Sequence, residues 1–278
     1  MAQDPIEARH ETVLEKLIEV AEADDRVVAA WLQGSRADGS ADPFSDIDFY
    51  IAISDEAYDS FDRLEFIERA ANVLVHAELP RNLGVVCLLQ GPVKLDLLVE
   101  RASAVGQTNR PAAKMLVDKD NIESRLVTGW TPSRDDVARE VDRLIRMTFQ
   151  GASWPIRLLR RGQWMTHTYS EMTLIHSVIV PLMLAPSDPR VFQRNPMTRE
   201  RLLPKAEREE IDTLARDVLT ALASRSFEKA YSAHLRITDS LGRAGRGACE
   251  RFDLEFPEAA EQEALRFYER EWPRNSDD

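Results

Sequence analysis

The stretch "WLQGSRADGSADPFSDIDFYIAI", residues 31–53, contains the clearest strand and loop signals in the sequence. It runs from an apolar segment through a loop of small and polar residues into a second apolar segment, which opens with Asp46 and Asp48. Short apolar runs between turn residues are typical of buried strands. The sequence therefore predicts strands over 26–33 and 46–53, joined by a glycine-containing loop.

The two aspartates predict a site for a divalent cation. Side chains alternate along a strand, so Asp46 and Asp48 point to one face while Ile47 and Phe49 point to the other. Two carboxylates side by side raise each other's pKa and are unfavourable unless a cation or hydrogen-bond donors compensate. Mg²⁺ takes hard oxygen ligands of this kind.

A third carboxylate is expected on a nearby strand. The runs "LGVVCLLQ" (83–90) and "VKLDLLVE" (93–100) are separated by Gly-Pro, which predicts two antiparallel neighbours. Asp96 lies in the middle of the second run, where a charge is otherwise expensive, and Lys94 and Glu100 share its face. If the aspartate-bearing strand is a neighbour, Asp96 completes a three-carboxylate cluster for one or two divalent ions.

The loop after the first strand suits phosphate oxygens. Gly34 lets backbone N–H groups approach a ligand closely, and the Ser35 hydroxyl adds a donor. Arg36 follows and is a candidate phosphate ligand, with an exposed loop arginine as the alternative. Metal ions, a phosphate cradle and a carboxylate that can take a proton together describe in-line substitution at phosphorus.

Residues 1–130 are predicted to form a mixed domain and residues 131–278 a helical one. The first domain has an amphipathic helix at 6–24, a helix at 60–75 and about four strands. Ser133 and Asp136 resemble a capping box, and helical periodicity follows to the end of the chain. The predicted helices of the second domain span 134–149, 166–185, 205–224, 227–246 and 257–272.

Charge and composition limit the classes of function that the sequence allows. Residues 1–132 carry 24 acidic and 13 basic side chains, against 24 and 23 in 133–278, and the net charge is −12. An acidic field argues against a general nucleic-acid binder and suits a metal ion or a cationic small substrate, although a solvated acidic surface is the simpler alternative. The two cysteines are expected to be packing residues.

No membrane segment or signal peptide is expected. The longest apolar run, residues 173–184, contains His176 and Pro181. The first residues lack the basic and apolar regions of a signal peptide, which predicts a cytoplasmic protein.

Two features of the second half are weaker candidates. Arg157, Arg160 and Arg161 form a basic cluster that could bind a triphosphate or be a solvated face. Glu171 could meet a cationic substrate.

The motif resembles the signature of the DNA polymerase β-like nucleotidyltransferase superfamily. It consists of Gly34-Ser35, ten intervening residues, Asp46-Ile47-Asp48, and later Asp96 within Leu-Asp-Leu. The resemblance implies an α+β fold with a small mixed sheet packed on helices, and Mg²⁺ bound by Asp46 and Asp48. It also implies that Asp96 binds metal or serves as general base, with Glu100 as the alternative base because some relatives use a glutamate near this strand.

A narrower resemblance concerns the whole chain. A nucleotidyltransferase domain followed by a helical domain of similar size is similar to the antibiotic nucleotidyltransferases. "DDRVVAAWLQGSRADG" and the C-terminal "RFDLEFPEAAEQEALRFYEREW" look most like the lincosamide branch, with the aminoglycoside enzymes second. This resemblance implies transfer of AMP from ATP to a drug hydroxyl, with the helical domain walling the drug pocket, often across a homodimer.

Other acceptors and a non-catalytic role are the alternatives. A nucleotidyltransferase of this fold could modify a macromolecule or an unknown metabolite, and the lack of a basic surface counts against RNA. A catalytically silent nucleotide-binding protein is the other alternative. The presence of all three carboxylates argues against this alternative, because their mutual repulsion is unfavourable and a protein that only binds a nucleotide does not require it.

Overall fold

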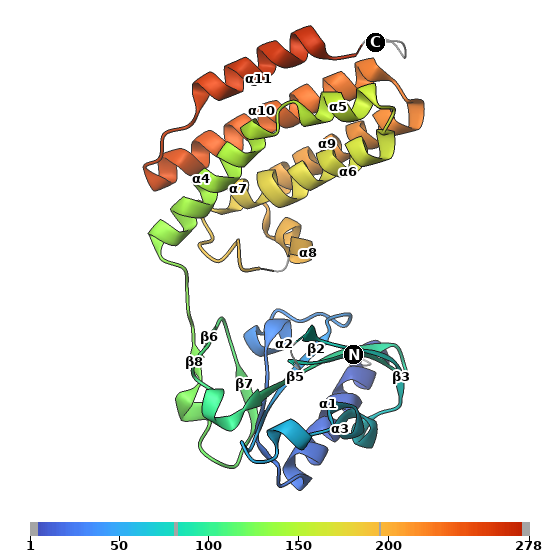
Figure 1. Ribbon diagram of the computed structural model, residues 1–278, viewed down its shortest axis with the longest axis vertical. Helices are drawn as coiled ribbons and strands as arrows, with labels where there is room; N and C mark the ends of the chain where they lie inside the picture. Colours follow the sequence, from blue (N-terminus) through green and yellow to red (C-terminus); the bar gives the residue numbers. More distant parts are fainter. Residues whose placement is uncertain (1–4, 81–82, 195, 274–278) are drawn as a thin grey trace. The chain divides into compact units, whose positions relative to one another are not determined.

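The computed structural model describes residues 5–80, 83–194 and 196–273. It divides into two compact units, Met1–Trp130 and Thr131–Asp278 (Figure 1). The first unit mixes helices and strands, and the described part of the second is helical. The expected α+β class, with a mixed sheet followed by a helical region, is confirmed.

Six strands form the main sheet of the first unit, in the order β3-β4-β5-β2-β1-β7. The main elements of this unit are α1 (Pro5–Ala23), β1 (Val27–Leu32), α2 (Gly34–Asp38), β2 (Ile47–Ile53), α3 (Arg63–Ala70), β3 (Val73–Glu78), β4 (Gly84–Leu89), β5 (Val93–Arg101), β6 (Asn109–Arg110), β7 (Lys114–Asp118) and β8 (Val127–Thr128). β2 and β5 are parallel, and the other neighbours in the main sheet are antiparallel, including the predicted pair β4 and β5.

The two faces of this sheet have different roles. On one face, α1 and α3 pack over a core that includes Ile47, Phe49 and Ile51, all completely buried. The alternate residues of β2 point to the other face, where a smaller apolar cluster around Trp31 covers part of the sheet. Beyond that cluster, the same face carries the half-buried Asp48. The alternation thus separates the core from the candidate site.

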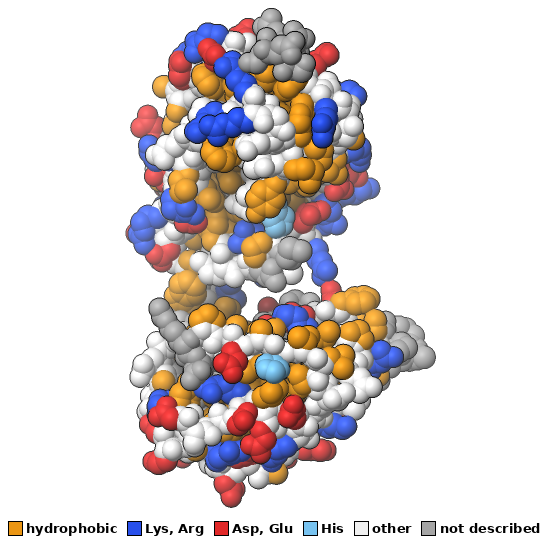
Figure 2. Space-filling view, turned by 45° about the vertical axis from the view of Figure 1, so that its right-hand side comes forward, with side chains coloured by type: hydrophobic (Ala, Val, Ile, Leu, Met, Phe, Trp, Pro, Cys, Tyr) orange, Lys and Arg blue, Asp and Glu red, His pale blue; other side chains and the backbone are white. Residues whose placement is uncertain are grey.

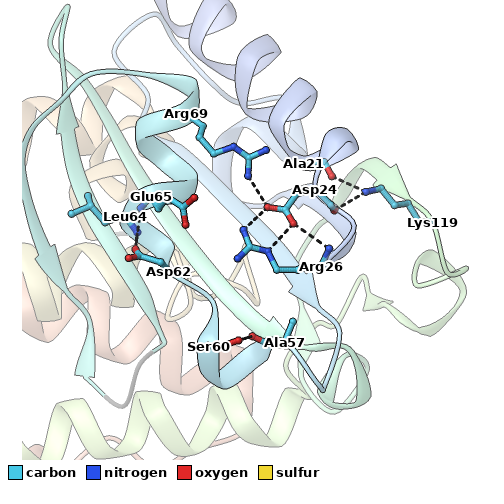
Figure 3. Close-up of polar contacts among 10 residues, drawn as sticks. All are labelled: Ala21, Asp24, Arg26, Ala57, Ser60, Asp62, Leu64, Glu65, Arg69 and Lys119. Atoms are coloured by element: carbon cyan, nitrogen blue, oxygen red, sulfur yellow. Dashed lines mark hydrogen bonds and ion pairs between the residues drawn. The ribbon is translucent and has the colours of Figure 1, made fainter.

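A buried carboxylate joins several elements on the helical side of the sheet (Figure 3). Asp24, which is 6% exposed, accepts hydrogen bonds at 2.7 Å from both Arg26 and Arg69. Lys119 donates to the backbone carbonyls of Ala21 and Asp24, at 2.9 Å each. Hydrogen bonding from Arg26, together with that from Arg69, lowers the pKa of Asp24. These contacts tie the end of α1 to α3 and to the residue that follows β7.

Two predictions for this unit are wrong. The helix expected over 60–75 ends at Ala70, and Val73–Glu78 forms strand β3. The sequence of β3 contains two β-branched valines, and its residues pair with β4, so sheet contacts prevail over the helical period. The sheet also has six strands rather than about four, because β3 and the short β7 were not recognised.

The second unit is built from helices around its own core. Its helices are α4 (Arg134–Gln150), α5 (Trp154–Arg160), α6 (Trp164–Leu174), a π-helix (Ile175–Ile179), α7 (Val180–Leu184), α8 (Pro196–Arg199), α9 (Lys205–Ser224), α10 (Phe227–Phe252) and α11 (Glu258–Glu271). Val137, Val141 and Ile145 line the buried face of α4 at intervals of one turn. None of the described helices is long and apolar enough to span a bilayer.

Local sequence signals explain two boundaries of this unit. The predicted capping box is confirmed: Ser133 Oγ accepts from the Asp136 amide, and the Ser133 amide donates to the Asp136 carboxylate at 3.0 Å. The expected helix 166–185 is instead α6, the π-helix and α7. Pro181 has no amide hydrogen to donate, which accounts for irregular helical bonding in the turn before it.

Candidate active site

The loop between β1 and β2 packs directly against one of the predicted metal ligands. Gly34 opens α2 with φ +62°, and a Cβ atom built there would lie 2.2 Å from Asp48 Oδ2. The Gln33 amide donates to the Asp48 carbonyl at 3.0 Å. Glycine is therefore required at position 34 both for its backbone conformation and for the close approach of the Asp48 carboxylate.

Arg36 holds this loop in place. Its Nε donates to the carbonyl of Asp46 at 3.1 Å, and its Nη2 donates to the carbonyl of Ser45 at 3.0 Å. Ser35 precedes it in α2 and is half-buried. The guanidinium thus fixes the backbone just before β2 and has further N–H groups for a phosphate.

The central parallel pair brings the predicted carboxylates together. Asp48 of β2 and Asp96 of β5 are direct register partners. Asp46 lies immediately before β2, and its carboxylate and that of Asp96 contact the same lysine. The Lys94 ammonium is 2.5 Å from Asp46 Oδ2 and 3.1 Å from Asp96 Oδ2.

The electrostatics of this cluster favour a positive ligand. Burial, together with the neighbouring Asp96 and Asp46 carboxylates, raises the pKa of Asp48. Burial lowers the pKa of Lys94, but the hydrogen bonds that it donates to Asp46 and Asp96 outweigh burial and the net shift is upward, so the ammonium stays charged. Asp96 Oδ1 is buried and has no hydrogen-bond partner among the residues that the structure describes.

The donor set fits a divalent cation, although the three carboxylates are not yet arranged around one. Within residues 5–80, 83–194 and 196–273, no three His, Cys, Asp or Glu side chains form a ready metal-binding group. Two carboxylates already converge on the Lys94 nitrogen, and a third, Asp48, lies beside them. The unpartnered Asp96 Oδ1 is the kind of buried atom that a cation satisfies.

Glu100 lies on the same face of β5 but has a different partner. Its register partner is Ala52, four residues beyond Asp48, and its carboxylate accepts from the guanidinium of Arg110. Arg110 is 2% exposed and lies 5.4 Å from the centre of the Trp31 ring. The ion pair is therefore part of the packing on this face. Sequence patterns do not single out Arg110, although it lies only ten residues from Glu100, because the contact depends on how the chain folds back after β5.

The weaker candidate residues of the second unit contact other residues of the same unit. Arg160 donates to the Glu271 carbonyl at 3.0 Å, and Arg157 lies over the Trp154 ring. Glu171 is 1% exposed and contacts His234 Nδ1 at 3.0 Å, so its carboxylate has a buried partner in place of a cationic substrate. Its burial follows from its position on the inner face of α6.

Comparison with known proteins identifies the first unit. Residues 15–102 match the family model "Polymerase beta, Nucleotidyltransferase". A comparison with curated protein sequences found no match. An aminoglycoside 6-adenyltransferase from Bacillus subtilis is similar in structure with a TM-score of 0.39 and 14% identity, over 96% of this chain and 98% of that chain. A Thermotoga maritima CCA-adding enzyme, complexed with tRNA, has a TM-score of 0.35 and 12% identity, over 92% and 69%.

Structural likenesses with TM-scores this low do not identify an acceptor. The family match, by contrast, runs from α1 to the end of β5 and contains Gly34, Asp46, Asp48 and Asp96. Nucleotidyltransferases of this fold use a divalent metal and a nucleotide. The first unit is thus a nucleotidyltransferase domain of the polymerase β type, and the protein is a nucleotidyltransferase.

Proposed function

We propose that the protein is a Mg²⁺-dependent adenylyltransferase that moves AMP from ATP to a hydroxyl of a small antibiotic, lincosamide-like first and aminoglycoside second. The observation that supports it most is the convergence of Asp46 and Asp96 on the Lys94 ammonium, with Asp48 beside Asp96 on the neighbouring strand, within a nucleotidyltransferase domain. The helical unit, residues 131–278, is assigned to acceptor binding.

Asp46, Asp48 and Asp96 are the residues that would hold Mg²⁺. When bound, Mg²⁺ supplies positive charge that stabilises the developing negative charge at the reacting phosphate. Ser35 and the backbone after Gly34 bind phosphate oxygens of ATP, and Arg36 keeps this loop against the start of β2. The chain's own contribution is positioning, which supplies much of the catalysis in phosphoryl transfer.

Asp96 is assigned as the general base. Its carboxylate takes the proton of the acceptor hydroxyl. The hydroxyl oxygen then forms a bond to the α-phosphorus, the bond to the β-phosphate bridging oxygen breaks, and pyrophosphate leaves. Glu100 is the less suitable base, because its carboxylate is paired with the buried Arg110.

Charge supports a cationic small acceptor over a polyanion. The excess of acidic residues in 1–132 attracts the protonated amines that lincosamides and aminoglycosides carry. On the face that Figure 2 shows, basic side chains are interspersed with acidic ones rather than forming a continuous basic surface. A polynucleotide acceptor usually requires such a surface.

Mass spectrometry tests the proposal directly. The purified protein is incubated with ATP, Mg²⁺ and a panel of lincosamides and aminoglycosides, with Asp48→Asn as the control. A product heavier than its acceptor by one AMP group, absent with the control, supports the proposal and identifies the acceptor class. If no drug gains mass while the folded protein binds ATP, the antibiotic assignment is wrong and a metabolite or macromolecular acceptor takes its place.

A further inference from the structure

Lys94 brings a fixed positive charge to the centre of the candidate active site. Its ammonium contacts Asp46 Oδ2 and Asp96 Oδ2 at 2.5 and 3.1 Å, and these are two of the three carboxylates assigned to the cation. Lys94 is the cation that directly contacts two of these carboxylates, whereas the nearby Arg36 binds backbone carbonyls of Ser45 and Asp46. The lysine therefore acts as the counter-ion of the site.

A divalent cation and the Lys94 ammonium cannot share these two oxygens. Mg²⁺ binds oxygen ligands at about 2.1 Å. The Lys94 ammonium already occupies Asp46 Oδ2 and Asp96 Oδ2, so a divalent cation held by these two oxygens would compete with a charge of the same sign. Binding of one must therefore displace the other from this position.

Lys94 has freedom to move once it is displaced. Its side chain is 45% exposed and has a flexible four-carbon stem. It points to the sheet face that also carries Asp48, against which the Gly34 loop packs. A mobile ammonium on this face is a suitable partner for phosphate oxygens, since lysine binds phosphate as a point charge.

We propose that Lys94 has two positions: in the nucleotide-free protein it closes the carboxylate site as a substitute cation, and on binding of the metal–nucleotide it moves to contact the triphosphate. This inference rests on the proposed function. It adds that the free site disfavours metal without nucleotide, so that metal and nucleotide bind together.

Calorimetry on the full chain tests both positions. Mn²⁺ alone is titrated first, and then a non-hydrolysable ATP analogue in saturating Mg²⁺. Lys94→Met removes the charge and keeps a long side chain, whereas Lys94→Arg keeps the charge. Lys16→Met, on the exposed face of α1, is the control for the change in net charge.

The expected result is a pair of opposite shifts. Removal of a like charge makes Lys94→Met bind Mn²⁺ about tenfold more tightly than the wild type. Loss of a charge-assisted phosphate contact makes it bind the analogue about tenfold more weakly. The Mn²⁺ affinities of Lys94→Arg and Lys16→Met stay within about twofold of the wild-type affinity, because both variants keep a positive charge at position 94. General damage to the fold would weaken both ligands together.

Two results overturn this inference alone. In the first, Lys94→Met binds Mn²⁺ no more tightly than the wild type does. In the second, Lys94→Met binds the ATP analogue as tightly as the wild type does. In both cases the wild type must bind the analogue. Absence of analogue binding by every protein, wild type included, would instead overturn the proposed function and this inference with it.

Discussion

Asp48 and Asp96 lie directly opposite each other across the parallel strands β2 and β5. These strands occupy the middle of the sheet, with two further strands on each side. Residues on central strands are held by hydrogen bonds from both neighbours, and a site on such strands is more precise than one on loops. The carboxylates therefore have a rigid support, whereas Lys94, which contacts two of them, has a long flexible stem.

We expect Asp96→Asn to lower kcat by about 100-fold or more, with a nearly unaltered KM for ATP, because it removes the assigned proton acceptor. Steady-state kinetics with the acceptor found by mass spectrometry measure this. Glu100→Gln is the matched comparison, since it changes a carboxylate on the same strand face that is paired with Arg110. If Glu100→Gln has the larger effect on kcat, Glu100 is the base.

Gly34→Ala should abolish transfer activity and Gly39→Ala should not. Both glycines have positive φ, at +62° and +79°, so an alanine is strained at either position. Only at Gly34 would the new Cβ meet a carboxylate oxygen, since nothing lies within 4 Å at Gly39. Activity normalised to folded protein separates the two effects. Equal losses in both variants would mean that backbone strain, and not the contact with Asp48, is responsible.

Asp24→Asn should destabilise the first unit by about 2–3 kcal/mol at pH 7, because it weakens charge-assisted hydrogen bonds to Arg26 and Arg69. The folded-state pKa of Asp24 is lower than the unfolded value, so its carboxylate stabilises the fold above about pH 4. That contribution is lost as pH falls toward the folded-state pKa. Urea unfolding at several pH values should therefore show the two proteins converging in stability below pH 4. A constant difference would contradict this assignment.

Glu171→Gln should lower the stability of the helical unit by about 1–3 kcal/mol, because it leaves the buried His234 without an ionised partner. Burial raises the pKa of Glu171, but the interactions with His234 and His167 outweigh burial, and the net shift is downward. Glu263→Gln, an exposed change on α11, is the control and should leave the urea midpoint unchanged. Equal midpoints for the two variants would show that the buried pair adds nothing.

Periodicity predicted those parts of the molecule in which local sequence and final environment agree. The helix at 205–224 forms over those residues, and alternation placed Asp46 and Asp48 away from the core. Strand β3 was missed because "NVLV" continues an apolar pattern that suits a helix as well as a strand. Pairing with β4 makes this segment a strand, and such pairing depends on residues that are not adjacent in the sequence.

The contacts between carboxylates and their partners could not be read from the sequence in the same way. Alternation placed Lys94 and Asp96 on one face, but the bridge from Lys94 to Asp46 depends on β2 and β5 being neighbours. The sequence alone does not show that these strands are neighbours, because strand order is set by the packing of the whole sheet.

The parallel pairing of β2 and β5 also has a consequence for the biogenesis of the protein. A parallel neighbour needs a crossover, and here the chain must form α3, β3 and β4 between the two strands. Asp48 and Asp96 therefore meet only after a non-local loop closes, which is a slow step in folding. A nascent chain that ends before β5 cannot bring these two aspartates together, so the candidate site forms only after β5 has been synthesised and paired.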